Sequence, residues 1–392
     1  MSEGCATLPG MTTEHRPQVA SDEVRPHPAH REITRPIALR AVLSAGVSLH
    51  GARIQDVDLG PYEADLLARE DLAGLVVLGG ELSDRLAHHL RLHGALVFPT
   101  DLTCPVNPYR ATLYRPEELY DGMLDRGYES TPDALAYAWS READQAHDVF
   151  VTLVRAIHDD SVSDALTEVL DGRRVVGVMG GHALMRGTPE YASAARLGHL
   201  LARAGDVVLT GGGPGAMEAA NLGALAPDLP ALDAALEALA AVPSFRPDVQ
   251  AWAALALEVR EGLLDGGSGP VRSVGVPTWF YGHEPPNVFG QGVAKYFSNA
   301  LREDALLSRC TAGLVVLPGA AGTVQEIFQA VTPLYYAAEG VPVPPLVLVD
   351  ETHWERTIPV LPALRALGAQ RGLGASTHVV GTVEEAAALL AG

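Results

Sequence analysis

Short apolar runs alternate with longer stretches of helical periodicity in the C-terminal half of the chain. Runs such as residues 314–317, which hold no charge, are typical of strands buried on both faces of a sheet. Residues 188–205 are typical of the helices, because Thr188 caps the stretch and Gly205 ends it. We predict strands at residues 174–179, 206–210, 272–276, 313–317, 346–349 and 378–380. This alternation predicts a parallel, doubly wound, Rossmann-like α/β sheet, in which ligands bind at the carboxyl ends of the strands.

A smaller α/β unit precedes this sheet. The segment AGLVVL occurs in it at residues 73–78 and recurs at residues 312–317, each time before a glycine turn. Chance and an ancient duplication account for the recurrence about equally well, because many buried strands have a similar run of small and branched apolar residues. In this unit we predict a helix with a serine cap at residues 83–93 and strands at residues 53–59, 74–78 and 95–98.

Composition shifts divide the chain into four segments. Residues 1–34 mix Pro, His, Glu, Arg and Thr without periodicity, which predicts a flexible tail. Residues 35–125 form the small α/β domain, and residues 126–172 form a helical connector that starts at Thr131 and Pro132 and breaks near residues 159–163. The Rossmann-like domain fills residues 173–392, with an alanine- and leucine-rich helical insertion at residues 226–268 that serves as a lid or an oligomer contact.

The composition excludes several functional classes. The chain has 392 residues, 47% of them hydrophobic, and a net charge of −20, which disfavours a nucleic-acid partner. Lys295 is the single lysine, so a GxxxxGK phosphate loop is absent and a pyridoxal Schiff base has only this candidate. Cys5, Cys104 and Cys310 suit free thiols in a reducing cytosol. No apolar run suits a signal or membrane segment, so we expect a cytoplasmic protein without a membrane partner.

Three glycine-rich loops follow predicted strands: GGHALMRG at residues 180–187, GGGPGAMEAAN at 211–221 and PGAAGTVQE at 318–326. In the usual order of a doubly wound sheet, the first and third loops flank the switch-point crevice and the second lies beside them, so they converge on one pocket. Backbone N–H groups at Gly319 and Gly322, with the positive end of the following helix, suit a phosphate. Residues 211–216 fit the dinucleotide pattern GxGxxA only weakly, because they follow the second strand and no acidic residue lies about 20 positions on.

These motifs resemble a known family. PGAAGTVQE is similar to the PGGxGTxxE signature of the LOG superfamily, once catalogued as lysine decarboxylases and now understood as nucleoside 5′-monophosphate phosphoribohydrolases. GGGPGAMEAANLGA, the preceding GGH, the pair Glu190 and Tyr191, and EPPN at residues 284–287 resemble its bacterial branch, the pyrimidine/purine nucleotide 5′-monophosphate nucleosidases. The resemblance covers roughly residues 174–350. It implies hydrolysis of the N-glycosidic bond of a nucleoside 5′-monophosphate, without a cofactor or a metal.

Glu326 is the residue that we expect to be catalytic. Breaking the bond builds positive charge on the ribose, which a carboxylate stabilises while it orients the attacking water. Thr323 and Glu326 also fit the capping box T-x-x-E, so a structural role competes with the catalytic one. The family carries an arginine on the preceding helix; Arg302 is nearest, one position early, with Glu303 in the family's place. We assign Arg302 a contact with phosphate or with transition-state charge.

Further residues of the loops are candidates for substrate binding. We expect His182 to meet the base and Arg186 the phosphate unless both stabilise their loop, and Glu218 either bonds the ribose or favours a helix N-terminus. Met217 lines the pocket in the family, and Asn287 either contacts the base or belongs to a turn fixed by prolines. The predicted substrate-binding residues are Gly181, His182, Arg186, Gly212, Gly213, Gly215, Ala216, Met217, Glu218, Asn287, Pro318, Gly319, Gly322 and Thr323.

Departures from the signature keep a second function open. Ala320 stands where the family has glycine, and Gln325 replaces a common carboxylate, which would suit a carrier or sensor that binds a phosphorylated ligand without cleaving it. A positive φ at Ala320 would cost of order 1 kcal/mol. His89 and His93 have helical i, i+4 spacing, but we predict a solvated face there and no metal site. We expect the chain to form a homo-oligomer.

Overall fold

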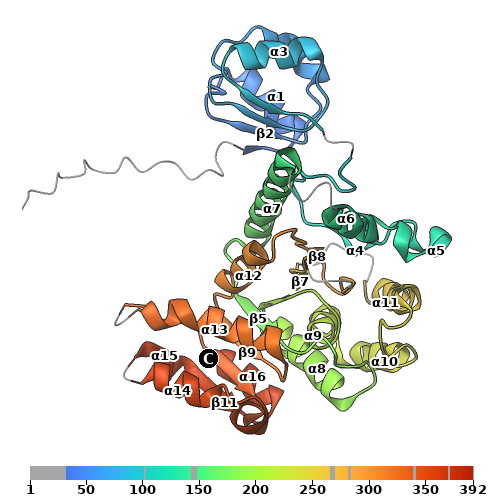
Figure 1. Cartoon of the computed structure of the whole chain (residues 1–392), viewed down its shortest axis with the longest axis vertical. Helices are drawn as coiled ribbons and strands as arrows, with labels where there is room; N and C mark the ends of the chain where they lie inside the picture. Colours follow the sequence, from blue (N-terminus) through green and yellow to red (C-terminus); the bar gives the residue numbers. More distant parts are fainter. Residues whose placement is uncertain are drawn as a thin grey trace, which may run out of the picture. The chain divides into compact units, whose positions relative to one another are not determined.

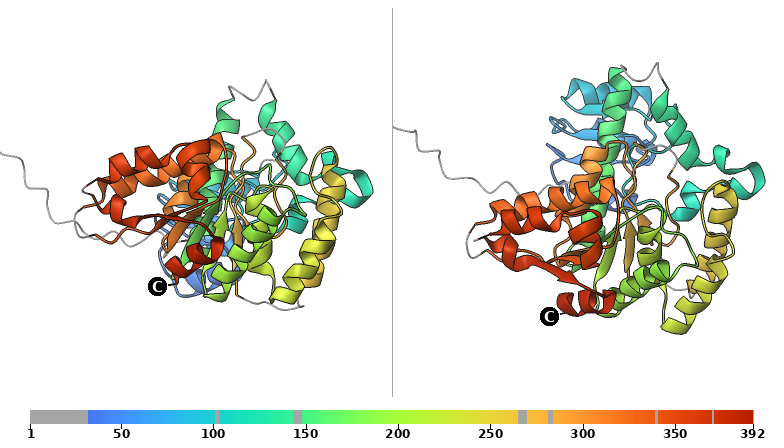
Figure 2. Two further views of the ribbon diagram at one scale, coloured as in Figure 1. Left: turned by 90° about the horizontal axis from the view of Figure 1, so that it is seen from below. Right: turned by 60° about the horizontal axis from the view of Figure 1, so that its bottom comes forward.

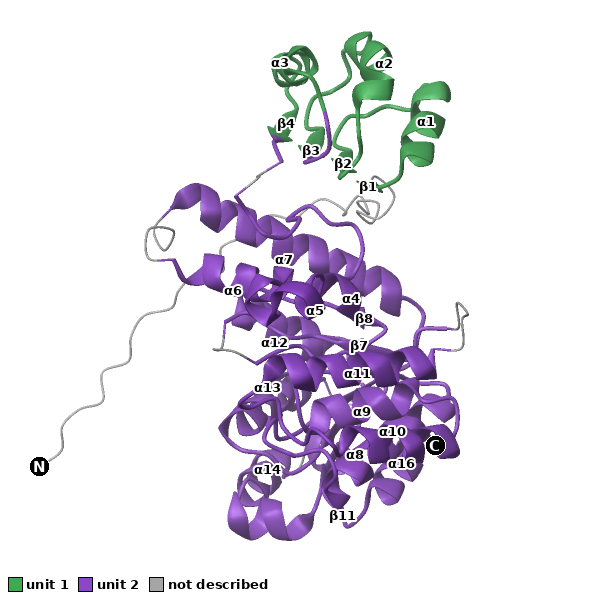
Figure 3. Ribbon diagram, turned by 90° about the vertical axis from the view of Figure 1, so that its right-hand side faces the viewer, with its two compact units in different colours: residues 1–77, 82–97 green, residues 78–81, 98–392 purple. Residues whose placement is uncertain are grey.

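The computed structural model describes residues 32–100, 103–142, 148–264, 270–280, 284–338, 341–369 and 371–391. The chain forms two compact units, which Figure 3 shows in separate colours. The first unit reaches Val77 and includes Leu82–Val97; the second comprises Leu78–Glu81 and Phe98–Gly392. Most of the predicted tail lies outside the described residues.

The first unit is built on a four-stranded sheet of order β1-β2-β3-β4. Leu39, Leu49, Leu66, Leu86 and Leu90 are fully buried in its core. Its elements are β1 (Glu32–Ile33), α1 (Pro36–Ser44), β2 (Arg53–Gln55), η2 (Gly60–Tyr62), α2 (Glu63–Leu67), β3 (Val76–Leu78), α3 (Asp84–Leu92) and β4 (Leu96–Phe98). The serine-capped helix and the strands predicted at residues 74–78 and 95–98 are confirmed at slightly shorter lengths, whereas the strand predicted at residues 53–59 ends at Gln55.

The second unit contains a seven-stranded sheet of order β11-β10-β9-β5-β6-β7-β8, in which neighbouring strands run parallel. Its strands are β5 (Val175–Met179), β6 (Val207–Thr210), β7 (Ser273–Gly275), β8 (Gly292–Val293), β9 (Gly313–Val316), β10 (Leu346–Val349) and β11 (Thr377–Val380). The chain winds outward from β5 in one direction and from β9 in the other, so the predicted doubly wound α/β fold is confirmed. The switch point lies between β5 and β9.

Helices cover both faces of this sheet (Figures 1 and 2). Helix α8 packs against α9 and α16, while α13 packs against α12 and α15. The helices that accompany the sheet are α8 (Pro189–Arg203), α9 (Ala216–Leu225), α12 (Asn299–Ser308), α13 (Ala321–Tyr336), the π-helical turn η5 (His353–Thr357), α14 (Leu361–Gly368), α15 (Gly372–Ser376) and α16 (Val383–Leu390). The predicted insertion supplies two further helices, α10 (Leu229–Leu239) and α11 (Val249–Leu263).

The chain before the sheet differs from its prediction in several places. Glu32–Ile33, assigned to the tail, form β1 and pair with β2. The elements α4 (Pro116–Leu119) and α5 (Met123–Arg126) group with the larger unit, because the Tyr120 hydroxyl donates to the Pro286 carbonyl over 2.6 Å. The connector contains η3 (Tyr128–Ser130), α6 (Pro132–Arg141) and α7 (Val149–Leu170).

The predicted break at residues 159–163 is wrong, because α7 runs through it. Asp159 and Ser161 are weak helix formers, but both are buried there, and the Ser163 hydroxyl donates back to the Asp159 carbonyl over 2.8 Å. Tertiary contacts therefore override the local preference. No helix among the described residues combines the length and hydropathy that a membrane span requires.

Candidate functional site

A cavity of about 1050 Å³ opens at the carboxyl ends of the central strands. Loops after β5, β6 and β9 form its walls, and residues after β7 and β10 complete it. Its volume is at the upper end of the roughly 300–1,000 Å³ typical of small-molecule sites. The three glycine loops therefore meet in one cavity at the switch point, as the sequence predicts.

The loop after β9 offers an anion site at the N-terminus of α13. Ala320 is the N-cap and has no side-chain capping bond, and the first turn of α13 contains no acidic residue, so its positive end is open to the cavity. Gly319 must be glycine, because a Cβ there would lie 2.2 Å from Thr323 Oγ1. His353 Nε2 supports the loop, 3.0 Å from the Gly319 carbonyl oxygen.

The geometry of this loop excludes two possibilities that the sequence left open: backbone strain at Ala320 and a capping role for Glu326. Ala320 has φ −119°, so this loop needs no left-handed residue and its alanine causes no backbone strain. Because α13 begins at Ala321, Thr323 already lies inside the helix and cannot act as its N-cap. The capping-box interpretation of Glu326 is therefore wrong, and Glu326 lines the cavity instead.

The loops after β5 and β6 pack tightly on each other. Gly215 has φ +74°, and a Cβ there would lie 2.5 Å from the Gly181 carbonyl oxygen. The Ala216 amide donates to that same carbonyl over 3.1 Å. Met217 follows and lines the cavity. The glycines of these loops thus allow two backbones to meet beside the cavity.

Arg302 and two glutamates form a charged cluster in the cavity wall. Arg302 Nη2 lies 3.0 Å from Glu303 Oε1, and Arg302 Nη1 lies 3.6 Å from Glu326 Oε1. All three residues are buried, at 7%, 4% and 8% exposure. Within the described part of the chain, Arg302 Nε and Glu303 Oε2 have no hydrogen-bond partner. Both atoms are themselves buried, and buried polar atoms without a partner are uncommon in folded proteins.

Burial and like charge change the acidity of both carboxyl groups. Burial, and next the neighbouring Glu303, raise the pKa of Glu326 to about 7, although Arg302 acts in the opposite direction. Burial also raises the pKa of Glu303, while Arg302 and a hydrogen bond with Asn299 lower it. A carboxyl group with a pKa near 7 exchanges protons readily at neutral pH, as general acid–base catalysis requires.

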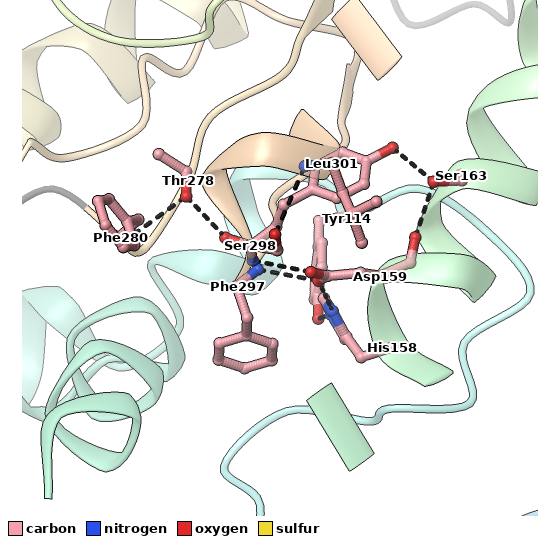
Figure 4. Close-up of polar contacts among 10 residues, drawn as sticks. Tyr114, His158, Asp159, Ser163, Thr278, Phe280, Phe297, Ser298 and Leu301 are labelled. Atoms are coloured by element: carbon pink, nitrogen blue, oxygen red, sulfur yellow. Dashed lines mark hydrogen bonds and ion pairs between the residues drawn. The ribbon is translucent and has the colours of Figure 1, made fainter. Parts of the chain in front are cut away.

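Helix α12, which carries Arg302 and Glu303, is held at its N-terminus by a buried carboxylate (Figure 4). Asp159 accepts hydrogen bonds from the backbone nitrogens of Phe297 and Ser298, over 2.9 and 2.8 Å. His158 Nδ1 lies 3.0 Å from the same carboxylate, and the other ring nitrogen lies 2.7 Å from the Tyr114 hydroxyl. Burial lowers the pKa of His158, so the ring is neutral and donates from Nδ1.

Arg186 and Glu218 form a second buried pair, away from the cavity lining. Arg186 binds both oxygens of the Glu218 carboxylate and donates to the carbonyls of Val242 and Trp252. Its guanidinium also lies 4.6 Å from the Trp252 ring centroid. These contacts fix the first glycine loop to the insertion and leave neither side chain facing the cavity. The structure thus does not bring Arg186 or Glu218 to the site that the sequence assigned to them.

Asn287 also lies outside the cavity lining. Its amide donates to the Gly213 carbonyl and to the Asn221 side chain, both over 3.0 Å, and its backbone nitrogen donates to the Gly212 carbonyl. Asn287 therefore holds the second glycine loop from behind. Gly212 and Gly215 lie in that loop but outside the lining as well.

The structure brings the remaining candidates together. The predicted residues that line the cavity are Gly181, His182, Gly213, Ala216, Met217, Arg302, Pro318, Gly319, Gly322, Thr323 and Glu326. His182 is exposed, with Nδ1 3.7 Å from Glu284 Oε1. Glu190 and Glu284 also line the cavity; the sequence motifs include them, but we did not predict them as site residues. Sequence reasoning also missed the lining residues Glu303, Asp350 and His353. Glu303 carried a clue, since it occupies the position of the family's arginine; Asp350 and His353 follow β10 without a motif.

Lys295 does not lie in the cavity lining either. Its Nζ lies 2.5 Å from Asp133 Oδ1, in a buried pair that also receives the Trp279 indole N–H. Among the described residues, no group of His, Cys, Asp and Glu side chains suits a metal ion. His89 and His93 each bind a backbone carbonyl of their own unit, at Arg69 and at His89.

Comparisons with solved structures return distant similarities. TM1055, a Northeast Structural Genomics Consortium target, is 21% identical, with a TM-score of 0.34 over 55% of this chain and 98% of its own. The molybdenum cofactor carrier protein of Chlamydomonas reinhardtii is 19% identical, with a TM-score of 0.33 over 56% and 96%. The molybdenum cofactor binding protein of Rippkaea orientalis is 18% identical, with a TM-score of 0.34 over 56% and 96%.

The search of curated proteins returns no match. The SLOG cluster4 family matches residues 173–228, which contain β5, the first two glycine loops, α8, β6 and α9. These are the segments whose loops meet in the cavity beside the third glycine motif. This segment of the chain is therefore similar to the SLOG cluster4 family.

Proposed function

We propose that the protein hydrolyses the N-glycosidic bond of nucleoside 5′-monophosphates, releasing a free base and ribose 5-phosphate. The observation that carries this proposal is the place of Glu326: a buried carboxyl group lines the cavity one turn beyond an open helix N-terminus. A phosphate bound at that N-terminus would hold the ribose of a nucleotide close to Glu326.

The charged groups suit the proposed reaction. As the glycosidic bond breaks, positive charge grows on the ribose, and the Glu326 carboxylate would stabilise it and take a proton from the attacking water. Arg302, 3.6 Å from Glu326, favours the ionised form of this carboxylate.

The test is base release from a panel of AMP, GMP, IMP, CMP and UMP, followed by chromatography. We expect release from at least one nucleotide, and Glu326→Gln should lower it by at least 10²-fold while nucleotide affinity is retained. Asp304→Asn is a matched control on the same helix as Arg302, because Asp304 is exposed, pairs with Gln329 and lies outside the lining. Saturable binding of the nucleotides without release of any base would instead support a carrier or sensor.

A further inference from the structure

A second cavity opens at the opposite edge of the seven-stranded sheet, where the chain enters the strands. Its volume is about 520 Å³, within the range of small-molecule sites, and it shares no lining residue with the cavity at the carboxyl ends. Three segments form it: the turn before β5, the turn between α8 and β6, and the residues before β7. We call it the arginine pocket, and its lining residues are Gly172, Arg173, Arg174, Ala202, Arg203, Gly205, Asp206, Val207, Pro270, Val271 and Arg272.

The sheet brings arginines from distant parts of the sequence together in this pocket. Strands β5, β6 and β7 are parallel neighbours. The Val207 nitrogen donates to the Arg174 carbonyl over 2.9 Å, which joins the starts of β5 and β6. The Val208 nitrogen donates to the Arg272 carbonyl over 2.8 Å, which joins β6 to the start of β7. The backbone of these arginines is therefore fixed at adjacent strand ends.

Positive charge in the arginine pocket exceeds negative charge. Four arginines line it, and Asp206 is the one acidic residue among the described residues of the lining, so three positive charges are in excess. Asp206 is buried and accepts from Arg174 Nε over 2.9 Å. The whole chain has a net charge of −20, so a positive cavity is a local departure from the rest of the molecule. A concave site lined by one sign of charge concentrates its field and attracts ions of the opposite sign.

Two of the four guanidinium groups have no protein partner within the described part of the chain. Arg173 donates to the Val271 carbonyl over 2.8 Å, which holds it at the wall of the pocket. The side chains of Arg203 and Arg272 form no hydrogen bond or ion pair with described residues. Arg203 is exposed at the end of α8, and Arg272 is partly buried. Each guanidinium has five N–H donors, so both can bind ligand oxygens in place of water.

The charge and the donors together suit a chain of phosphate groups. A guanidinium binds two phosphate oxygens at once through parallel N–H groups. One phosphate group carries a charge of roughly −1.5 to −2 at neutral pH, which would leave the pocket positive, whereas two or three linked groups balance it. The rest of the described lining consists of Asp206 and of glycine, alanine, valine and proline residues, so it offers no aromatic ring on which a base could stack.

We propose that the arginine pocket binds anions that contain two or three linked phosphate groups. The inference goes beyond the proposed function and does not depend on it, because the pocket and the cavity that contains Glu326 lie at opposite ends of the strands. Arg203 and Arg272 bind the phosphate chain, and Arg173 adds the donors that Val271 leaves free. Inorganic tripolyphosphate and the triphosphate of a nucleotide share this chemistry.

Isothermal titration calorimetry without divalent cations tests the proposal and distinguishes the two sources. We expect saturable binding of tripolyphosphate to wild type and at least tenfold weaker binding of inorganic phosphate, because a single group engages fewer of the arginines. Equal affinity for ATP would show that the phosphate chain alone is recognised. At least tenfold tighter binding of ATP would identify a nucleotide as the ligand.

Paired substitutions locate the bound anion. R203A/R272A should weaken tripolyphosphate binding at least tenfold and leave base release from nucleotides unchanged. The control R196A/R365A removes the same charge from exposed ion pairs outside both cavities, and its affinity should stay within about threefold of wild type. Circular dichroism checks that the variants are folded. The single variant R203A, at an exposed position, repeats the test if the double variant does not fold.

Three results would overturn the proposal. The first is the absence of saturable tripolyphosphate binding to folded wild type. The second is equal weakening in R203A/R272A and in the control, which would show that only the net charge of the chain matters. The third is displacement of bound AMP by tripolyphosphate, which would place the anion at the N-terminus of α13. A failure of base release from every nucleotide would contradict the proposed function and leave these binding results unaffected.

Discussion

Two arginine–glutamate clusters are buried on both sides among the described residues of the larger unit, and they differ in which polar atoms they leave unpaired. In the Arg186–Glu218 pair, both carboxylate oxygens and two backbone carbonyls receive the guanidinium hydrogens. In the Arg302 cluster, one guanidinium serves two carboxyl groups, and Nε and one glutamate oxygen lack partners among the described residues. Both clusters are buried, so burial does not distinguish them.

The difference separates a structural pair from a candidate reactive one. A fully bonded ion pair has no capacity left for a ligand and contributes by fixing the segments that it joins. In the Arg302 cluster some donors and acceptors are not hydrogen-bonded, and burial, followed by incompletely balanced charge, raises the pKa of its carboxyl groups. Removing a member of each cluster should therefore have opposite consequences for folding and for chemistry.

The largest effect on stability is expected for Arg186→Ala. The substitution leaves the Glu218 carboxylate buried and unpaired, so the free energy of unfolding should fall by about 3–5 kcal/mol. Urea unfolding followed by circular dichroism measures the change. Arg196→Ala is the control, because the Arg196–Asp233 pair is exposed at 3.8 Å and should contribute no more than about 1 kcal/mol. Equal losses for the two variants would remove the contrast between the clusters.

The Arg302 cluster should make the free energy of unfolding depend on pH. The folded-state pKa of Glu326 is about 7, against 4.5 for an ordinary glutamate, so the protonated form is favoured by folding. Its stabilisation is complete below about pH 4.5 and is lost as pH rises through 7, by about 3 kcal/mol in total. The unfolding free energy of wild type minus that of Glu326→Gln should fall by this amount from pH 4.5 to 8. A difference that does not vary with pH would contradict the raised pKa.

Loss of the anchor at α12 should affect stability less and chemistry more. Asp159→Asn replaces one acceptor oxygen of the carboxylate that holds Phe297 and Ser298, so we expect a loss of about 1–2 kcal/mol in unfolding free energy. Base release should fall as well, because Arg302 and Glu303 are carried by that helix. Ser163→Ala removes a hydroxyl that bonds the Asp159 backbone carbonyl and the Tyr296 hydroxyl but not the Asp159 carboxylate, so it should leave base release unchanged. Equal activity losses would disprove the positioning role.

The smallest effect is expected for His353→Ala. The ring supports Gly319 at the phosphate loop by one hydrogen bond at a partly exposed position, so stability should change by no more than about 1 kcal/mol. Affinity for AMP, measured by calorimetry, should weaken several-fold because the loop is less well held. Unchanged affinity would show that the helix N-terminus alone suffices.

Local features of the fold could be predicted because they are local in sequence. The hydroxyls of Ser83, Thr131 and Thr188 each accept a backbone hydrogen bond three residues on, as the cap patterns indicate. Uncharged apolar runs located the central strands for the same reason. The two-residue strand β8 was missed, because its pairing depends on β7 and on the antiparallel bridge between Val293 and Tyr114.

The site was predicted less completely, because its chemistry depends on contacts between distant segments. The glycine loops and Glu326 were found through motifs. The motifs do not reveal that Arg186 is already paired with Glu218. They also do not reveal that one Glu303 oxygen lacks a partner among the described residues, because both facts depend on how the surrounding helices pack. A residue's type and its place in a motif predict where it lies, but whether its hydrogen bonds are already satisfied decides what it can do.

The two carbonyls that Arg186 reaches, at Val242 and Trp252, belong to the insertion at residues 226–268. The insertion is therefore not a removable module. Shortening it to a minimal loop would take away both acceptors and the Trp252 ring, and would expose a charged pair at the base of the first glycine loop. In protein engineering or in evolution, changes in this helical pair and in that loop should therefore come together.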